Sequence, residues 1–386
     1  MKREIVKNVY EVGSKHPDRE LFDEVIPLPD GTSYNAYLVI GSEKTALIDT
    51  VDPDKTDELL DHLESLGIKK LDYVISNHTE QDHSGSIPAV LKKFSKARLI
   101  TNAKGKELLI EHLHIAEEKF DIIDESSELS LGDRTLKFIN TPWVHWPETM
   151  STYLVQDKIL FSCDFFGAHL GKKDLFIKDQ QKDYISAKRY FAEIMMPFRA
   201  AIRGNLKKLE NYDIKYIAPS HGPVIDDPKF IIDAYQDWIS DETKNEVIIC
   251  YCSMHGSIKE AVDRLVKKLG NKTKVHLFNL TKTDLGELAI NLVDARTIVF
   301  ATSTFLNGPH PNVANAIVLT NALRPKTKYI SVIESFGWGS RTTEIVFEML
   351  GSLNAEKLSC IKFRGKAKAN DLEAIDKLAD EILSKN

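Results

Sequence analysis

Short apolar runs and amphipathic stretches divide the first part of the chain into many brief elements. Residues 34–40 and 45–50 are β-rich runs around the polar turn 41–44, a pattern that predicts a β-hairpin. Residues 71–76 form an apolar run that predicts a strand and ends next to a cluster of polar residues. The same reasoning predicts strands at 98–101, 120–123, 135–140, 151–155, 158–162 and 216–220, and helical stretches at 57–66, 85–94, 184–208 and 227–241.

The pattern changes after the polar segment 242–245. From there, apolar strands alternate regularly with amphipathic helices, which is typical of a doubly wound parallel sheet. We therefore expect an α/β protein with a domain boundary near residue 245, giving domains 1–244 and 245–386. The second domain is expected to contain strands at 247–251, 274–280, 297–301, 328–333 and 357–363, and helices at 258–269, 284–293, 313–323, 342–353 and 372–384.

Composition narrows the class of protein further. A chain of 386 residues suits two or more domains, and its net charge of −6 gives no sign of a nucleic-acid-binding surface. No apolar run is long enough for a transmembrane helix, and the N-terminus lacks the apolar region of a signal peptide. The four cysteines form no CxxC pair and lie in or beside apolar runs, so we expect buried thiols and a cytoplasmic protein.

The strand at 71–76 leads into the most informative segment of the chain. Four side chains that commonly bind metals lie within residues 78–83, and three more follow other apolar runs. A single histidine or aspartate in such a place is usually structural, but chance does not account for the whole set. Nitrogen and oxygen donors without sulfur suit two metal ions, with iron or manganese as plausible as zinc. The candidate ligands are His78, Glu80, Asp82, His83, His145, Asp164 and His221.

The spacing suggests how these ligands are shared. His78 and Glu80 are two residues apart, so they lie on the same side of an extended segment. Asp82 and His83 are adjacent and diverge, which allows them to serve a second metal. Asp164 is the candidate for a carboxylate that bridges the two ions, and His169 is a candidate for a residue just outside the ligand set.

Three loops of the second domain are candidates for a cofactor site. The loop at 252–257 is rich in glycine and hydroxyl groups and precedes a predicted helix, which suits an anion, although many such loops are only helix caps. The loops at 303–310 and 335–339 follow strands and carry aromatic residues that could flank a planar ring. The candidate residues are Ser253, Met254, His255, Gly256, Ser257, Ile258, Ser303, Thr304, Phe305, Leu306, Asn307, Gly308, Ser335, Phe336, Gly337, Trp338 and Gly339.

The hairpin at 34–50 and the seven candidate ligands resemble the metallo-β-lactamase fold. Zinc hydrolases of that fold carry His-x-His-x-Asp-His, whereas this chain has Glu80 in place of the second histidine. That substitution resembles the signature of flavodiiron proteins, and an anionic ligand suits iron better than zinc. The resemblance implies one iron bound by His78, Glu80 and His145, and another bound by Asp82, His83 and His221, with Asp164 bridging them. In some members of the family the histidine that matches His83 is not a metal ligand.

The second domain resembles a flavodoxin domain that binds FMN. The resemblance implies that the first loop holds the phosphate and that the other two hold the isoalloxazine ring. The chain departs from the common phosphate loop at Ile258, where a hydroxyl residue is frequent, and at His255, where an aromatic residue is common.

The resemblance implies a cytoplasmic oxidoreductase that reduces dioxygen to water, nitric oxide to nitrous oxide, or both. Electrons would pass through FMN from rubredoxin or a reduced deazaflavin coenzyme, and the spelling of residues 163–169 is similar to the methanogen branch that uses the latter. The resemblance also implies a head-to-tail homodimer, or a homotetramer made of two such dimers, which would bring the FMN of one subunit to the iron site of the other. The alternatives are a zinc hydrolase with a fused flavodoxin domain and an electron carrier with a purely structural lactamase-like domain.

Overall fold

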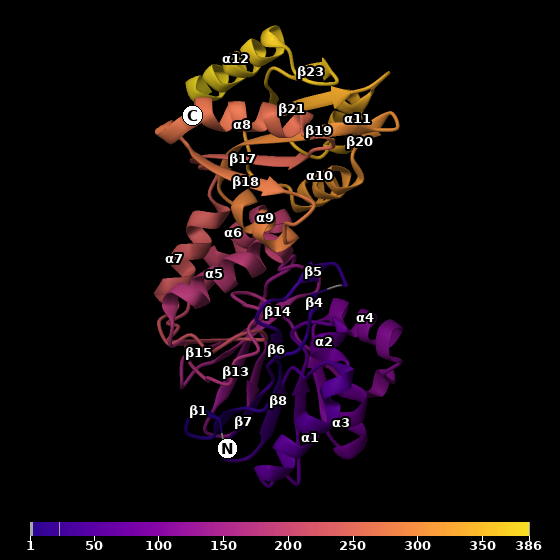
Figure 1. Ribbon diagram of the computed structural model, residues 1–386. Helices are drawn as coiled ribbons and strands as arrows, with labels where there is room; N and C mark the ends of the chain where they lie inside the picture. Colours follow the sequence, from indigo (N-terminus) through magenta and orange to yellow (C-terminus); the bar gives the residue numbers. More distant parts are fainter. Residues whose placement is uncertain (1–2, 23, 386) are drawn as a thin grey trace. The chain divides into compact units, whose positions relative to one another are not determined.

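The computed structural model describes residues 3–22 and 24–385, and it divides into two compact units (Figure 1). The first unit consists of the chain up to Phe191 together with Phe198–Ile239. The second consists of Ala192–Pro197 together with the chain from Ser240 onward. Within the described residues, no helix combines the length and the apolar character needed to cross a membrane.

The first unit contains two main sheets. The predicted hairpin is confirmed, because β7 (Tyr37–Ile40) and β8 (Thr45–Ile48) pair antiparallel. The larger sheet continues from β8 through parallel strands, and its order is β1 (Glu4–Val6), β2 (Val9–Glu11), β7, β8, β9 (Tyr73–Ile75), β10 (Arg98–Thr101) and β11 (Phe120–Ile122). The smaller sheet has the order β12 (Glu128–Ser130), β13 (Thr135–Asn140), β14 (Met150–Leu154), β15 (Ile159–Cys163) and β16 (Tyr216–Pro219). Short strands form two further pairs, β3 (Ser14–His16) with β6 (Thr32–Tyr34), and β4 (Leu21–Phe22) with β5 (Ile26–Pro27).

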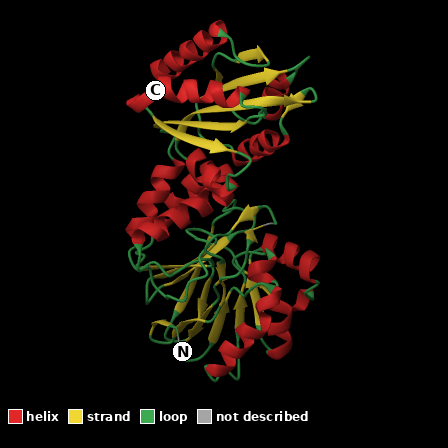
Figure 2. Cartoon of the chain, viewed as in Figure 1, coloured by secondary structure: helices red, strands yellow, loops and turns green. Residues whose placement is uncertain are grey.

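Alternating side chains on the larger sheet bury two separate cores. In β7, Tyr37 and Val39 belong to the core that also contains Phe138 of the smaller sheet. Leu38, between them, belongs to the core that contains residues of three helices, as expected from the two-residue period of a strand. These helices are α1 (Thr56–Ser65), α3 (Ile87–Lys93) and α4 (Ala103–Leu113), which lie along one side of the strands (Figures 1 and 2).

The remaining long helices of the first unit are α5 (Gln180–Tyr190), α6 (Arg199–Leu209) and α7 (Pro228–Ile239). The helical stretch predicted at 184–208 is interrupted, because a π-helical turn (Phe191–Met195) and a 3₁₀ turn (Met196–Phe198) separate α5 from α6. Pro197 has no backbone N–H to donate, so an α-helix cannot continue through it without losing a hydrogen bond. Further 3₁₀ turns lie at Pro53–Lys55, Glu117–Lys119 and Gly270–Lys272.

The second unit is the predicted doubly wound parallel sheet. Its strand order is β18 (Lys274–Asn279), β17 (Lys244–Cys252), β19 (Ala295–Phe305) and β21 (Tyr329–Phe336), followed by β22 (Glu356–Lys357) and β23 (Ile361–Arg364), which both pair with β21. Helices α8 (Ser257–Leu269) and α12 (Ala369–Lys385) cover one face of this sheet (Figure 1). Helices α9 (Leu285–Leu292) and α10 (Pro311–Leu323) lie on the other face, and α11 (Thr342–Met349) and the short strand β20 (Gly308–Pro309) complete the unit.

Two expectations for this unit are corrected. The strand predicted at 357–363 is split into β22 and β23, and the carbonyl of Ser359 between them accepts a hydrogen bond from the Ser331 hydroxyl at 2.7 Å. A side chain thus replaces a strand partner at this point. Cys360 in the same interruption is exposed, whereas Cys163, Cys250 and Cys252 are buried as expected.

Candidate metal centre and cofactor cavity

The candidate metal ligands of the first unit lie where strands end. His78 follows β9, Asp164 directly follows β15, and His221 lies two residues after β16. Glu80 has extended backbone and immediately precedes α2 (Gln81–Ser84), a helical turn that carries Asp82 and His83. The segment 78–83 is therefore extended only in its first half. Its second half is a helical turn, which points Asp82 and His83 in other directions than an extended chain would. His145 lies in the loop between β13 and β14.

The structure brings these seven side chains together in two groups. In the first group, the Nε2 atoms of His78 and His145 each lie 3.2 Å from Glu80 Oε2. The same two nitrogens lie 3.5 and 3.1 Å from Asp164 Oδ2. His78 is fully buried and Asp164 is almost so, whereas Glu80 and His145 are partly exposed.

The second group is formed around the other oxygen of Asp164. His83 Nε2 lies 3.0 Å and His221 Nε2 lies 3.3 Å from Asp164 Oδ1. The Asp82 carboxylate lies 3.2 Å from His83 Nε2 through one oxygen and 3.3 Å from His221 Nε2 through the other. Asp164 therefore presents one oxygen to each group.

These separations suit a metal ion at the middle of each group. Bonds of about 2.1 Å at angles between tetrahedral and square place neighbouring donor atoms about 3.0–3.4 Å apart. The buried atoms Asp82 Oδ1 and Asp164 Oδ1 also have no well-directed hydrogen bond within the described part of the chain. Burying a carboxylate oxygen without a hydrogen bond destabilises the folded protein unless a cation binds that oxygen. The donor set therefore fits two metal ions.

The electrostatics of the cluster also require positive charge. Burial alone lowers the pKa of an imidazole, yet hydrogen bonds to Asp164 and Glu80 raise the pKa of His145 to about 9. In the same way, Asp164 and Asp82 raise the pKa of His221 to about 10 against the effect of burial. Burial would raise the pKa of Asp164, but the surrounding histidines hold it well below its usual range. Without a metal, protons on the imidazoles supply the charge that bound cations would supply.

A shell of further polar residues holds the ligands. Asn77, next to His78, donates its backbone and side-chain N–H groups to Asp49 at 2.7 and 2.9 Å. His221 Nδ1 donates to the Ser33 carbonyl at 2.6 Å. Sequence reasoning missed Glu148, a buried carboxylate whose Oε1 lies 2.7 Å from His78 Nδ1. Its position three residues after His145 was the available signal.

A cavity of about 180 Å³ borders the second metal group. It is lined by Glu80, Asp82 and His221 together with aromatic and polar residues of the N-terminal strands, including Phe22 and Tyr34. His169, which the sequence suggested as a residue just outside the ligand set, also lines this cavity. Its ring lies 5.1 Å from that of His221, and its Nδ1 lies 2.9 Å from the Thr32 hydroxyl. The volume is sufficient for a small diatomic molecule.

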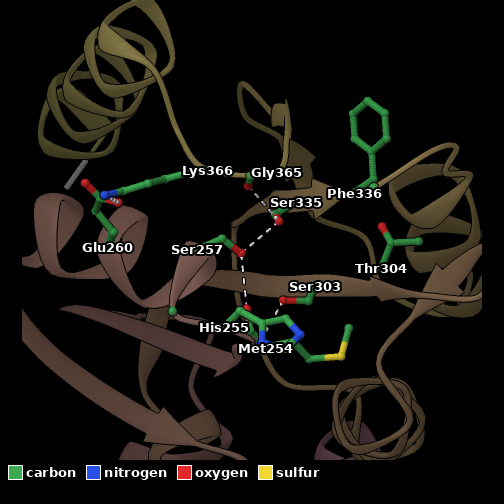
Figure 3. Close-up of a pocket in the computed structure, with 12 residues that line it drawn as sticks. Met254, His255, Ser257, Glu260, Ser303, Thr304, Ser335, Phe336, Gly365 and Lys366 are labelled. Atoms are coloured by element: carbon green, nitrogen blue, oxygen red, sulfur yellow. Dashed lines mark hydrogen bonds and ion pairs between the residues drawn. The ribbon is translucent and has the colours of Figure 1, made fainter.

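The second unit has a larger cavity, of about 580 Å³, at the carboxyl ends of its strands (Figure 3). Hydrogen bonds join the loops around it. Ser257 Oγ lies 2.9 Å from Ser335 Oγ, which donates to the Gly365 carbonyl at 3.2 Å, and the Met254 N–H donates to Ser303 Oγ at 3.0 Å (Figure 3). The predicted residues that line the cavity are Met254, His255, Gly256, Ser257, Ser303, Thr304, Ser335, Phe336 and Gly337.

Other predicted cofactor residues do not reach this cavity wall. The Ile258 side chain is fully buried in the core that α8 shares with the sheet, because the helical phase turns it inward. Ser253 Oγ accepts a hydrogen bond from the Lys259 N–H at 3.1 Å. The remaining residues outside the wall are Phe305, Leu306, Asn307, Gly308, Trp338 and Gly339. Sequence reasoning missed Glu260 in α8, and Gly365 and Lys366 after β23, which do line it.

Comparison with known proteins supports this arrangement. Residues 32–222 match the family described as ODP family beta lactamase. A nitric oxide reductase of Moorella thermoacetica is 33% identical over 85% of this chain and 84% of its own. A coenzyme F420H(2) oxidase of Methanothermobacter marburgensis is 32% identical over 83% of each chain. The solved structure of rubredoxin oxygen:oxidoreductase from Desulfovibrio gigas has a TM-score of 0.96 at 26% identity, and covers 100% of this chain and 98% of that one.

The fold and its two sites define an oxidoreductase in which a metallo-β-lactamase-like domain is joined to a flavodoxin-like domain. A solved structure similar to this chain, with a TM-score of 0.92 at 27% identity, is described as the flavodiiron protein from Giardia intestinalis. The chain belongs to the flavodiiron protein family. The hydrolase alternative is not favoured, since these relatives are oxidoreductases.

Proposed function

We propose that this protein reduces dioxygen, nitric oxide or both at a pair of iron ions, with electrons supplied through bound FMN. The observation that carries the proposal is the position of Asp164, whose two oxygens each face a separate group of histidine and carboxylate donors. Two adjacent cations joined by one carboxylate suit a reaction in which both ends of a small molecule, or two small molecules, are held together.

The donor sets favour iron. We assign His78, Glu80 and His145 to one iron, and Asp82, His83 and His221 to the other, with Asp164 between them. Glu80 contributes an anionic oxygen where zinc hydrolases of this fold have a second histidine. Cys163 Sγ lies within 4.8 Å of donor atoms of His83 and Asp164, but burial raises the pKa of this thiol, which disfavours the thiolate form that binds zinc. His83 is retained as a ligand, because its Nε2 is as close to Asp164 as that of any other histidine in the cluster.

The cavity in the second unit suits FMN. Helix α8 begins after Gly256, which provides no side-chain cap, so the backbone N–H groups of Ser257 and Ile258 are available for an anion, whereas that of Lys259 donates to Ser253 Oγ. We place the phosphate there, and the ring system between the loops that follow β19 and β21. Ile258 then contributes at most its backbone N–H, and Lys366 adds a positive charge beside the phosphate.

The residues around the two sites bind the cofactors, limit the access of water and leave a path for a small acceptor. When bound, the iron pair supplies redox chemistry to a small acceptor, and FMN converts a donor's electron pair into single electrons. The carboxylates of Glu80, Asp82 and Asp164 compensate the charge of the cations. Burial of His78 and His83 keeps water away from them, and the cavity beside His221 admits a diatomic acceptor.

We propose rubredoxin or a reduced deazaflavin coenzyme as the electron donor. The related proteins from Desulfovibrio gigas and Methanothermobacter marburgensis carry these two donors in their names, and the chain is similar to both. We further propose a head-to-tail homodimer, or a homotetramer made of two such dimers. The two cofactors belong to separate compact units, and such a dimer would bring FMN of one subunit to the iron site of its partner.

The experiment is a metal and flavin analysis of the purified protein followed by steady-state assays. We expect about two irons and one FMN per chain, and turnover of dioxygen, nitric oxide or both with at least one of the two donors. Colourless protein that contains zinc, or loaded protein that turns over neither acceptor with either donor, would refute the proposal. The ratio of the two turnover rates would identify the preferred acceptor.

A further inference from the structure

Glu148 is a buried carboxylate that contacts His78 at the ring nitrogen opposite the one that faces the metal cluster. Its side chain lies in the loop between His145 and β14, and the residue is 2% exposed. One oxygen, Oε1, lies 2.7 Å from His78 Nδ1, 3.0 Å from the Thr79 N–H and 2.7 Å from the Thr79 hydroxyl. The other oxygen, Oε2, is buried and has no hydrogen-bond partner among the described residues.

These contacts determine which proton each group carries. The Thr79 N–H can only donate, and the Thr79 hydroxyl donates to the same oxygen, so Glu148 Oε1 acts as an acceptor. His78 therefore carries a hydrogen on Nδ1 and donates it to Glu148. Its other nitrogen, Nε2, faces Glu80 and Asp164 and is the atom available to a cation. Glu148 thus fixes both the tautomer and the ring orientation of His78.

Two other histidines of the cluster, His221 and His83, have a weaker partner or none among the described residues. His221 Nδ1 donates to an uncharged backbone carbonyl, that of Ser33. His83 Nδ1 is buried and has no hydrogen-bond partner within residues 3–22 and 24–385. His78 is therefore the histidine for which a direct hydrogen bond to a carboxylate outside the ligand set is observed. The two metal groups have similar ligands, but the hydrogen-bond partners of those ligands differ.

We propose that Glu148 is a positioning residue that makes the iron held by His78 more electron-rich than its neighbour, and so lowers its reduction potential. The inference rests on the proposed function and deepens it. A carboxylate that accepts the outer N–H of a metal-bound imidazole raises the basicity of the inner nitrogen, and a more basic ligand stabilises the more oxidised metal. The two irons then differ in potential, although each has two histidines and a terminal carboxylate.

Glu148→Gln is the variant that tests this inference. Its carbonyl oxygen can still accept from His78 and Thr79, and its amide nitrogen can occupy the place of Oε2 without displacing a donor. The substitution removes the charge and largely keeps the shape. Glu148→Ala would leave three buried donors unpaired and could prevent folding, so its loss of iron would not distinguish a role in positioning His78 from a role in stability.

Glu334→Gln provides a matched control in the second unit. Glu334 is fully buried, and its Oε2 accepts from the Thr343 N–H at 2.8 Å and the Thr343 hydroxyl at 2.9 Å. This is the same pair of contacts that Glu148 makes with Thr79. Its other oxygen, Oε1, pairs with Lys362 Nζ at 2.9 Å, so Glu334, like Glu148 beside His78, is a buried carboxylate next to a basic group. The control therefore loses a comparable buried charge without touching the metal cluster.

The experiment is an EPR-monitored redox titration of the iron-loaded proteins, with ferrous-iron affinity measured separately. In Glu148→Gln we expect the midpoint potential of one iron couple to shift upward while the other keeps its value, and iron affinity to fall about 10- to 100-fold. The control should keep the wild-type potentials and affinity. Unchanged values in Glu148→Gln, or equal shifts in both variants, would overturn the inference. A wild-type protein that takes up no iron would instead refute the proposed function.

Discussion

The metal centre consists of buried side chains that converge from distant parts of the chain, whereas the cofactor cavity is lined by loops with small hydroxyl groups and glycines. In the metal centre, each contact depends on which atom a side chain carries, as with the two oxygens of Asp164. In the cavity, hydrogen bonds between the loops also involve backbone groups, those of Met254 and Gly365. A single substitution should therefore abolish iron binding at the first site, whereas it should only weaken FMN binding at the second.

The largest effect is expected for Asp164→Ala. Both donor groups lose a shared oxygen, and the remaining ligands no longer hold two cations at one carboxylate. Iron should be lost and reductase turnover should fall by at least about 100-fold. Removing a residue that only hydrogen-bonds to a metal ligand already lowers metal affinity or activity about 10- to 100-fold. Iron analysis and steady-state assays measure this, and the flavin absorbance should stay at the wild-type level. Full turnover in this variant would exclude Asp164 as a ligand.

A smaller effect is expected for Ser257→Ala in the cofactor cavity. Ser257 lines the cavity and contacts Ser335, and it lies at the start of α8 where we place the phosphate. Loss of one hydrogen bond, about 1 kcal/mol, should weaken FMN binding about five- to tenfold and leave iron content unchanged. Ser253→Ala is the comparison, because its hydroxyl faces the Lys259 N–H and not the cavity. A larger loss of FMN in Ser253→Ala than in Ser257→Ala would contradict this assignment of the loop.

Lys366→Ala should have a still smaller and salt-dependent effect. Lys366 lines the cavity beside Glu260, with Nζ 3.6 Å from that carboxylate, and both side chains extend toward each other (Figure 3). An exposed charge contributes about 0.2–1 kcal/mol, so FMN affinity should fall only a few-fold at low salt and less at high salt. Calorimetry with riboflavin, which lacks the phosphate, serves as the control. An equal loss for riboflavin would show that Lys366 does not act on the phosphate.

The smallest effect concerns the stability of the second unit at low pH. His276, which lies 2.8 Å from Glu246, lowers the pKa of that carboxyl to about 2 with the help of Lys274, while burial opposes the shift. A pKa lowered by folding stabilises the protein above the unfolded value of about 4.5, and this stabilisation is lost as the pH falls toward 2. Thermal unfolding should show Glu246→Gln below wild type at pH 7, with the difference shrinking by pH 3. A constant difference across this range would disprove the linkage.

The contrast between the two sites also explains what could be predicted from sequence. All seven cluster residues were found because metal-binding chemistry resides in particular side chains, and these residues lie in loops that follow strands of the two main sheets of the first unit. Glu148 was missed because a carboxylate becomes a partner of His78 only when β9 and the loop before β14 are folded together. The spacing of three residues from His145 indicates that Glu148 lies near the cluster, but it does not indicate that its partner is His78.

The cofactor loops were located correctly along the chain but not residue by residue. Ile258 lies in the right segment, yet the phase of α8 turns its side chain into the core. Lys366 was missed although the fifth strand was expected, because the loop after β23 was not included among the strand ends that surround the cavity. The direction of a side chain at a helix start, and the loops that close a cavity, depend on packing between elements.

The distribution of the metal-binding residues along the chain has a consequence for how the protein matures. His78 and His221 are carried by different sheets, and the second group of donors is incomplete until β16 has paired with β15. A nascent chain therefore cannot capture the full complement of iron before almost all of the first unit has been synthesised and has folded. Iron acquisition belongs to the end of maturation, and shortage of the metal should yield a folded apoprotein that awaits loading.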